Sequence, residues 1–339
     1  MHQNERTARC RIAATALVLG GMMPSYGKPV LADEGDPAEN AATIMKSYLD
    51  PSYITVGGGL STGGDVGSED LWFEADLNNH FQVLRINSFL LTLNPRVRLR
   101  MYRDDSAPVR TPSFMPGLAA FWTISCGQGQ GSSNDSFWYP YLMLSHHSNG
   151  QAGAFYAEDE IVASEDEKVR AGHVNTISGS FSTNFIRAGV GWVQDVNYIP
   201  TSMEVWTRWH PLEENRTDEL DGQYEKVAIG MSFRSAPKQY GLTKTWKYKA
   251  MGGISYSWGQ RGNNITDPKG ANPIVTEVDT HDRVSLELTA SARPPWSWTT
   301  RLGVFMRYDY GYDYYNIRFQ QRLNRLQIGF AADRYWGDE

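Results

Sequence analysis

The sequence predicts an all-β protein, a transmembrane antiparallel β-barrel of about twelve strands. From about residue 70 onward, roughly twelve segments of ~8–14 residues alternate apolar and polar side chains, with turn residues between them. The chain has 18 Tyr and 11 Trp, which gather at the segment ends as in the aromatic girdles of barrels. A soluble β-sandwich also alternates, but the repeated full charges on the polar faces favour a wet barrel interior.

The alternation is clearest near the C-terminus. Leu302, Val304 and Met306 share one face of a segment, whereas Arg307 and Asp309 share the other. The predicted strands are 71–81, 95–103, 113–125, 137–148, 180–193, 201–211, 224–235, 246–258, 283–293, 298–310, 314–321 and 325–336. The long connections are 104–112, 151–179 and 259–281, and we expect them on the outward rim, where such barrels carry their long loops.

The first part of the chain resembles a secretory signal. Positive charges at Arg6, Arg9 and Arg11 precede an apolar run at 12–23 that is too short to span a membrane as a helix. Small residues up to Ala32 suit cleavage before Asp33. The second of the two cysteines then remains alone in the mature chain, which excludes an intrachain disulfide.

The predicted domains are therefore a signal peptide at 1–32, an N-terminal arm at 33–68 and an outer-membrane barrel at 69–339. The glycine-rich stretch 53–60 is compatible with a strand or with part of the arm. The net charge of −6 argues against a basic surface for nucleic acid, so we expect no nucleic-acid partner.

The stretch Leu142 to Gly150 carries the groups that could do chemistry. Side chains alternate between the faces of a strand, so Leu142, Leu144, His146 and Ser148 share one face. A serine with a histidine two residues away has the parts of an activated nucleophile. Because this face continues from two leucines, the pattern suggests an enzyme whose substrate arrives from lipid.

Asn184, on the next long strand, also lies on an apolar face and could hold the imidazole in one tautomer. Three polar side chains that converge on a lipid face are costly unless they have a function. Other interpretations stay open: His146 and Asn184 as rim residues, and 148–150 as a turn. Ser145 and His147 form a mirrored pair on the opposite face.

Two motifs resemble the outer-membrane phospholipase A family: His146–Gly150 is similar to its His-x-Ser-Asn-Gly signature, and Ser180–Asn184 to its Ser-x-Ser-x-Asn segment. Weaker similarities lie at 106–116 and at 315–330. The resemblance covers most of the chain after about residue 70. The chain departs from the family in its long, acidic connection 151–179.

The resemblance implies a twelve-stranded barrel in the outer membrane that hydrolyses acyl esters of membrane glycerophospholipids at its outer wall. It implies Ser148 as nucleophile, His146 as base and Asn184 as orienting residue. It also implies a homodimer and calcium (Ca2+), with ligands at Ser106, Gln151 and Ser180, the latter two on the other subunit from Ser106. Calcium-bound water and the Ser148 amide would stabilise the oxyanion.

Two alternatives to this function remain. The chain could be a non-catalytic barrel that serves as a channel or an anchor, although inward charges such as Arg187, Arg301, Arg307 and Glu287 would fill most of a twelve-stranded lumen. It could be an esterase of the lipid A deacylase type, a class that has an acidic third member in place of asparagine. The acidic connection 151–179 could be a solvated loop or a cation site.

Overall fold

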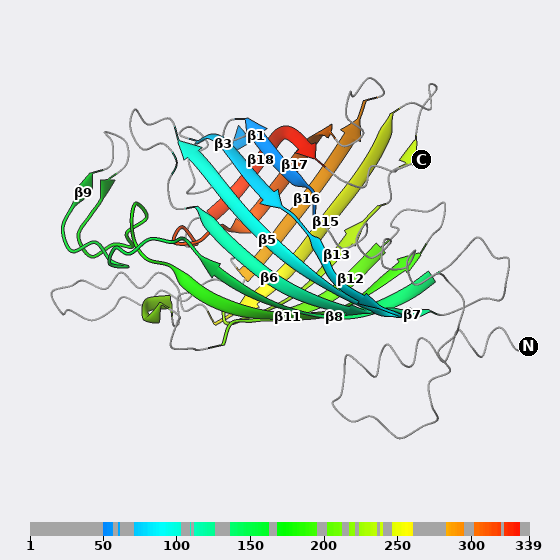
Figure 1. Cartoon of the computed structure of the whole chain (residues 1–339). Coiled ribbons are helices and arrows are strands. Elements are labelled where there is room, and N and C mark those ends of the chain that lie inside the picture. Colours follow the sequence, from blue (N-terminus) through cyan, green and yellow to red (C-terminus); the bar gives the residue numbers. More distant parts are fainter. Residues whose placement is uncertain are drawn as a thin grey trace, which may run out of the picture.

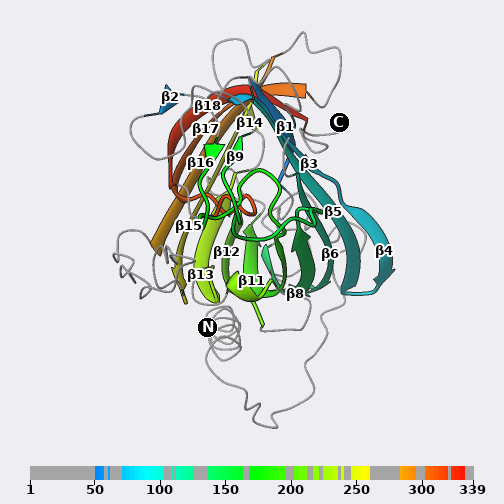
Figure 2. The same ribbon diagram turned by 90° about the vertical axis from the view of Figure 1, so that its left-hand side faces the viewer.

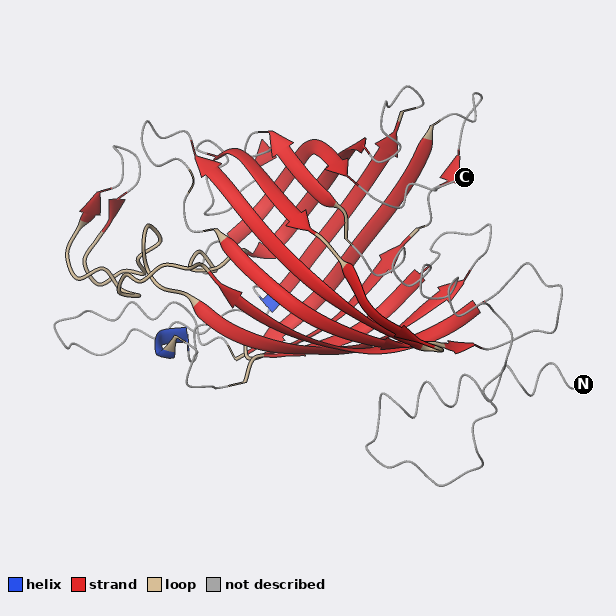
Figure 3. Ribbon diagram, in the orientation of Figure 1, coloured by secondary structure: helices blue, strands red, loops and turns tan. Residues whose placement is uncertain are grey.

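The computed structural model describes residues 50–56, 60–61, 71–102, 109, 112–125, 136–162, 168–194, 202–211, 217–220, 224–235, 238–239, 246–259, 283–294, 302–319 and 322–332. These residues are mostly in strands with very little helix, and the 3-10 helix η1 lies at Asp218–Leu220 (Figure 3). None of the described helical residues forms a helix long and apolar enough to cross a membrane. The predicted signal peptide lies outside the described ranges.

Twelve antiparallel strands form a closed barrel, which confirms the predicted fold class (Figure 1). In ring order they are β1 (Ser52–Val56), β3 (Leu71–Asn78), β5 (Phe89–Tyr102), β6 (Ser113–Trp122), β8 (Ser136–Ser148), β11 (Ser182–Gln194), β12 (Ser202–Trp209), β13 (Val227–Arg234), β15 (Lys247–Trp258), β16 (Val284–Arg293), β17 (Leu302–Tyr312) and β18 (Arg322–Ala332). The ring closes because β1 pairs with β3 on one side and with β18 on the other.

Short strands extend this wall. They are β2 (Leu60–Ser61) on β18, β4 (Phe81–Ile86) on β5, β7 (Ile124–Ser125) on β8 and β14 (Lys238–Gln239) on β15. A separate hairpin, β9 (Ile161–Val162) with β10 (Lys168–Val169), stands on the connection between β8 and β11.

The predicted number of strands is right, but one strand of the barrel comes from a different part of the chain than predicted. In the stretch 53–60, which the sequence leaves open as a strand or part of the arm, residues 53–56 belong to β1, and this strand closes the ring. The predicted strand 314–321 is wrong over its described part, because 314–319 is a connection with turns between β17 and β18. Tyr315, Asn316 and Ile317 are all at most 1% exposed, so both alternating faces are buried. A barrel wall needs one of those faces in lipid.

The outward faces of the strands are apolar and exposed, as the alternation predicted. In β17 and β18 the exposed side chains include Val304, Met306, Ile328 and Phe330, whereas Arg307 points inward and is buried. This is the alternation of a barrel wall that contacts lipid.

The inward charges form buried ion pairs. Arg100 binds Glu74 and Asp313, and Arg325 also reaches Glu74, at 3.1 Å. A second group joins Arg187 to Glu204, and a third joins Arg307 at 2.9 Å to Glu287, whose side chain is half exposed in the lumen. Paired charges are the arrangement that makes burial of ions tolerable. A cavity of about 310 Å³ remains among these side chains in the lumen.

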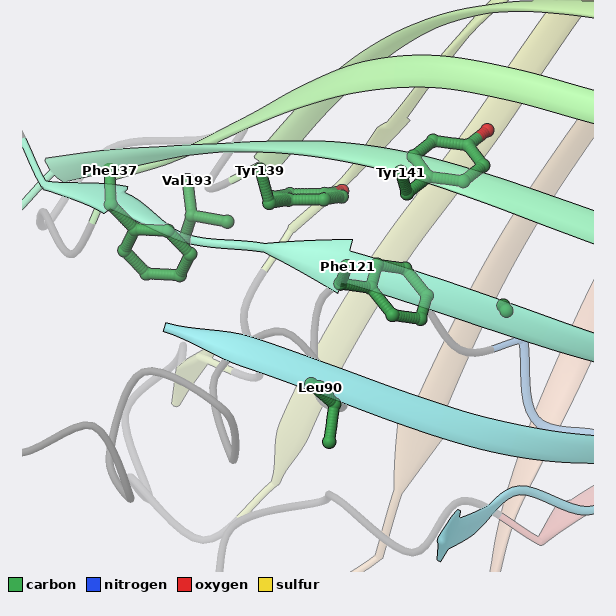
Figure 4. Close-up of a cluster of buried hydrophobic side chains, with 7 residues drawn as sticks. Leu90, Phe121, Phe137, Tyr139, Tyr141 and Val193 are labelled. Carbon is green, nitrogen blue, oxygen red and sulfur yellow. The ribbon is translucent and has the colours of Figure 1, made fainter. Parts of the chain in front are cut away.

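Two apolar clusters lie at opposite ends of the barrel interior. Figure 4 shows the first, formed by inward side chains near one end of β5, β6, β8 and β11: Leu90, Phe121, Phe137, Tyr139, Tyr141 and Val193. The second cluster lies at the mouth, where long connections meet: Phe155, Phe181, Leu220, Tyr224, Ile317 and Phe319. The described parts of the connections before β11 and before β18, which include Phe155, Phe181, Ile317 and Phe319, therefore pack together over the mouth, which faces the viewer in Figure 2.

Candidate functional site on the outer wall

His146 and Ser148 lie at the mouth end of β8 and on its outer face. Leu142 and Leu144, which precede them on that face, are 41% and 51% exposed, whereas the intervening Ser145 is 6% exposed. His146 and Ser148 are themselves partly exposed. The two candidate catalytic side chains are thus on the wall that contacts lipid.

Asn184 is brought to His146 by the pairing of β8 with β11. The antiparallel register places Asn184 opposite His146 and Ser182 opposite Ser148. The imidazole Nδ1 of His146 lies 2.8 Å from the side-chain oxygen Oδ1 of Asn184. Residues directly opposite in an antiparallel pair are close enough for such contacts.

This hydrogen bond fixes where the imidazole proton resides. An amide oxygen has no hydrogen to donate, so Nδ1–H of His146 must be the donor and Oδ1 of Asn184 the acceptor. A neutral imidazole with its proton on Nδ1 carries a lone pair on Nε2. His146 is therefore held in the tautomer that can accept a proton from a hydroxyl.

Apolar side chains surround this polar group. On one flank Phe114 of β6 is the register partner of Ser148, and Leu118 is the partner of Leu144. On the other flank Ile186 of β11 lies opposite Leu144. An ester with long acyl chains could rest on this surface with its chains in contact with hydrocarbon side chains.

The mirrored pair Ser145 and His147 points into the barrel. The hydroxyl of Ser145 donates to the carbonyl oxygen of Pro116 at 3.0 Å, and His147, 3% exposed, lies 3.2 Å from the hydroxyl of Ser113. Both side chains are engaged in internal contacts. The structure thus separates the two sets of residues that the sequence left as alternatives, one on each face.

A polar network supports β11 from the inside, next to Asn184. The hydroxyl of Thr183 contacts Nδ1 of His210 at 3.2 Å, and Nε2 of His210 lies 3.2 Å from Glu225. Burial by itself would raise the pKa of Glu225, but the Arg208 guanidinium and His210 hold that pKa at about 2. The carboxylate is therefore charged at neutral pH and anchors the inner side of the same strand.

Of the three predicted calcium ligands, Ser106 lies outside the described residues. Gln151 and Ser180 are described and lie on the connection between β8 and β11. Within the described ranges, no group of three or more His, Cys, Asp or Glu side chains could hold a metal ion. In the acidic connection, Glu158, Asp159 and Glu160 are exposed, and the remaining acidic residues at 165–167 are outside the described ranges.

Asn149 is a residue whose part in this site the sequence analysis missed. In the sequence it is part of a turn and of the resembled His-x-Ser-Asn-Gly motif and has no role of its own, yet its side chain is 1% exposed and binds the connection that leads into β11. The available signal was an asparagine between the candidate nucleophile and a glycine. Gly150 has a φ of +66°, and a Cβ there would lie 3.3 Å from the Phe114 ring, which together explain the glycine.

A closed barrel with an apolar outer wall defines the class: the chain is a multi-pass outer-membrane β-barrel protein. No protein-family model matches the sequence, and no curated protein matches it. Among solved structures the chain is similar to outer membrane phospholipase A from Escherichia coli, with a TM-score of 0.51 and 12% identity over 86% of this chain and 96% of that one.

It is also similar to the calcium-bound dimer of the Salmonella typhi outer membrane phospholipase. That similarity has a TM-score of 0.50 and 12% identity over 84% of this chain and 92% of the other. At such identities the likeness shows a shared barrel fold.

Proposed function

We propose that this protein is an outer-membrane phospholipase that hydrolyses acyl esters of glycerophospholipids, with Ser148 as nucleophile, His146 as base and Asn184 as orienting residue. The observation that carries the proposal is the 2.8 Å contact between His146 and Asn184 on the lipid-facing wall. A polar pair is costly on such a wall, and Ser148 lies two residues along the same face.

The proton transfers of the proposed reaction use groups that β8 and β11 supply, plus water. The hydroxyl oxygen of Ser148 attacks the ester carbonyl while Nε2 of His146 takes the hydroxyl proton. The imidazolium then returns that proton to the departing lysophospholipid oxygen, and an acyl-serine remains. Water hydrolyses the acyl-serine with His146 again as base, which releases the fatty acid and restores Ser148.

Calcium is the proposed cofactor, held by Ser106, the carbonyl oxygen of Gln151 and the hydroxyl of Ser180. Hydroxyl and carbonyl oxygens are ligands that suit a hard cation. Asn149 accepts hydrogen bonds from the amides of Gln151 and Phe181, which brings Gln151 and the neighbour of Ser180 to the same end of the strand pair. When bound, calcium would supply positive charge for the oxyanion.

The proposed active form is a homodimer, because the family resemblance places Ser106 on one subunit and the other two ligands on its partner. The solved Salmonella structure is a dimer with bound calcium. In this chain the exposed apolar wall around Leu118 and Leu144 offers a surface for such a partner in the membrane.

A second candidate is an esterase that acts on another envelope lipid, of the lipid A deacylase type. The residue that contacts His146 argues against it, because Asn184 offers a neutral amide where that class has an acidic side chain. A comparison of phospholipid with lipid A as substrate separates the two, and we expect turnover of phospholipid.

The direct test uses a long-chain alkyl sulfonyl fluoride, which modifies an activated serine. The refolded protein in detergent micelles with calcium should release fatty acid from phospholipid. It should lose this activity after treatment, and mass spectrometry should locate the label on Ser148. Loss of activity with the label on another serine would show that the nucleophile is that serine and not Ser148. If the untreated protein releases no fatty acid from phospholipid, the proposed function is refuted.

A further inference from the structure

We infer that Asn149 is a positioning residue for the proposed reaction, and that its side-chain amide keeps Ser148 aligned with the His146–Asn184 pair. The inference rests on the proposed function, since it concerns the alignment of that site. Asn149 itself is buried and does not contact the reacting atoms, so it would act through its chain neighbour, Ser148.

Asn149 makes four hydrogen bonds, three of which join the end of β8 to the segment before β11. Its side-chain nitrogen donates to the carbonyl oxygen of Gly179 at 2.7 Å. Its side-chain oxygen accepts from the amides of Gln151 at 3.2 Å and Phe181 at 3.0 Å. Its own amide donates to the carbonyl oxygen of Phe181 at 3.1 Å. One side chain thus satisfies main-chain groups on both sides of the connection.

The pairing register of β8 and β11 shows how these hydrogen bonds affect the proposed site. Ser148 and Ser182 are the last paired residues of β8 and the first of β11, and His146–Asn184 is the pair two residues further in. Strand ends open easily unless they are tied down. Loss of the Asn149 side chain would leave buried main-chain groups unsatisfied, and the strand end that carries Ser148 would be the first to move.

The chain offers a matched control at Asn175. Its side chain is 3% exposed, donates to the carbonyl oxygen of Ala154 at 3.1 Å and accepts from the amides of Ile177 and Ser178 at 3.3 and 3.0 Å. It therefore makes the same kind of contacts within the connection 151–179, but it does not bind the ends of β8 and β11. A general loosening of this connection would follow from either substitution.

The test compares Asn149→Ala with Asn175→Ala at saturating calcium. We expect Asn149→Ala to lower kcat at least about tenfold with KM within about twofold, since an error of about 1 Å in position can cost about 100-fold in rate. Amide hydrogen exchange should rise in the segments 149–151 and 179–183. Asn175→Ala should keep kcat within about threefold of wild type. If Asn149→Ala does not fold, Asn149→Asp, which keeps the acceptor for the amides of Gln151 and Phe181 but loses the donor to Gly179, should also lower kcat with KM nearly unchanged.

Three results would overturn the inference. One is wild-type kcat in a folded Asn149 variant, and a second is an equal loss of kcat in Asn175→Ala. The third is a rise in KM with unchanged kcat, since that pattern belongs to binding and not to alignment. If the wild-type protein does not hydrolyse phospholipid, the proposed function itself is refuted. If the wild type and the Asn149→Ala variant are both fully active, only the role inferred for Asn149 is refuted.

Discussion

The imidazole of His146 and the side-chain amide of Asn184 contact each other at 2.8 Å across the β8–β11 pair, on the wall that faces lipid. Their meeting follows from the register of two strands whose other outward side chains are largely apolar. A hydrogen-bonded pair in this position fixes the imidazole tautomer, which a rim histidine in contact with solvent would not require.

Replacement of Asn184 by alanine should lower kcat about 10- to 100-fold, because the Nδ1–H of His146 loses its acceptor and the imidazole is free to adopt the wrong tautomer or orientation. Initial rates of fatty-acid release from phospholipid micelles measure the effect. Ser182→Ala changes the neighbouring outward residue of β11 and should keep wild-type kcat. Unchanged kcat in Asn184→Ala would show that His146 needs no orienting partner.

Removal of calcium with a chelator should abolish hydrolysis, and added calcium should restore it. Ser180→Ala should raise the calcium concentration needed for half-maximal activity. Neutralisation of the exposed Glu158, Asp159 and Glu160 together should leave this concentration unchanged, because we place the ion at the ends of β8 and β11. Full turnover in chelator would show that the reaction does not need calcium. If only the triple variant needs more calcium for half-maximal activity, the ion binds at the acidic connection.

The segment 313–319 should keep the barrel closed to ions. The hydroxyl of Ser113 donates to the carbonyl oxygen of Tyr315, and the Arg100 guanidinium lies 4.1 Å from the centre of the Tyr315 ring. Ile317, fully buried, packs in the cluster at the mouth. This segment therefore connects β17–β18 to β5 and β6 on the inside of the barrel.

We expect no stepwise conductance from the wild-type protein in planar bilayers. A Tyr315→Ala, Ile317→Ala double variant should conduct, because it removes side-chain volume from the mouth. Ile328→Ala, which removes the same kind of side chain from the outer wall, should not conduct. Stepwise conductance by the wild type would favour the alternative of a channel.

The sequence predicted the barrel wall well because period-two alternation is a local property. The outward positions of Leu302, Val304 and Met306 and the inward position of Arg307 could be assigned without coordinates. The same rule failed at 314–319, since its local pattern resembles a strand, while its burial depends on Ser113, His147 and Phe155 from distant parts of the chain.

The site was predictable in part for the same reason. The face shared by His146 and Ser148 follows from alternation, but the contact of His146 with Asn184 depends on the register between two strands separated by a long connection. From the sequence, only their shared apolar faces and the family resemblance indicate that His146, Ser148 and Asn184 belong to one site. Asn149 was missed because its hydrogen bonds to Gly179 and Phe181 appear only once that connection is folded.

The most direct measurement is the rate of fatty-acid release from phospholipid micelles by Ser148→Ala beside Ser145→Ala. Both serines lie on β8, Ser148 on the outer face and Ser145 on the inner one. We expect Ser148→Ala to lose at least about 1,000-fold in kcat while its barrel stays folded, and Ser145→Ala to retain activity. Wild-type turnover by a folded Ser148→Ala protein would contradict the account.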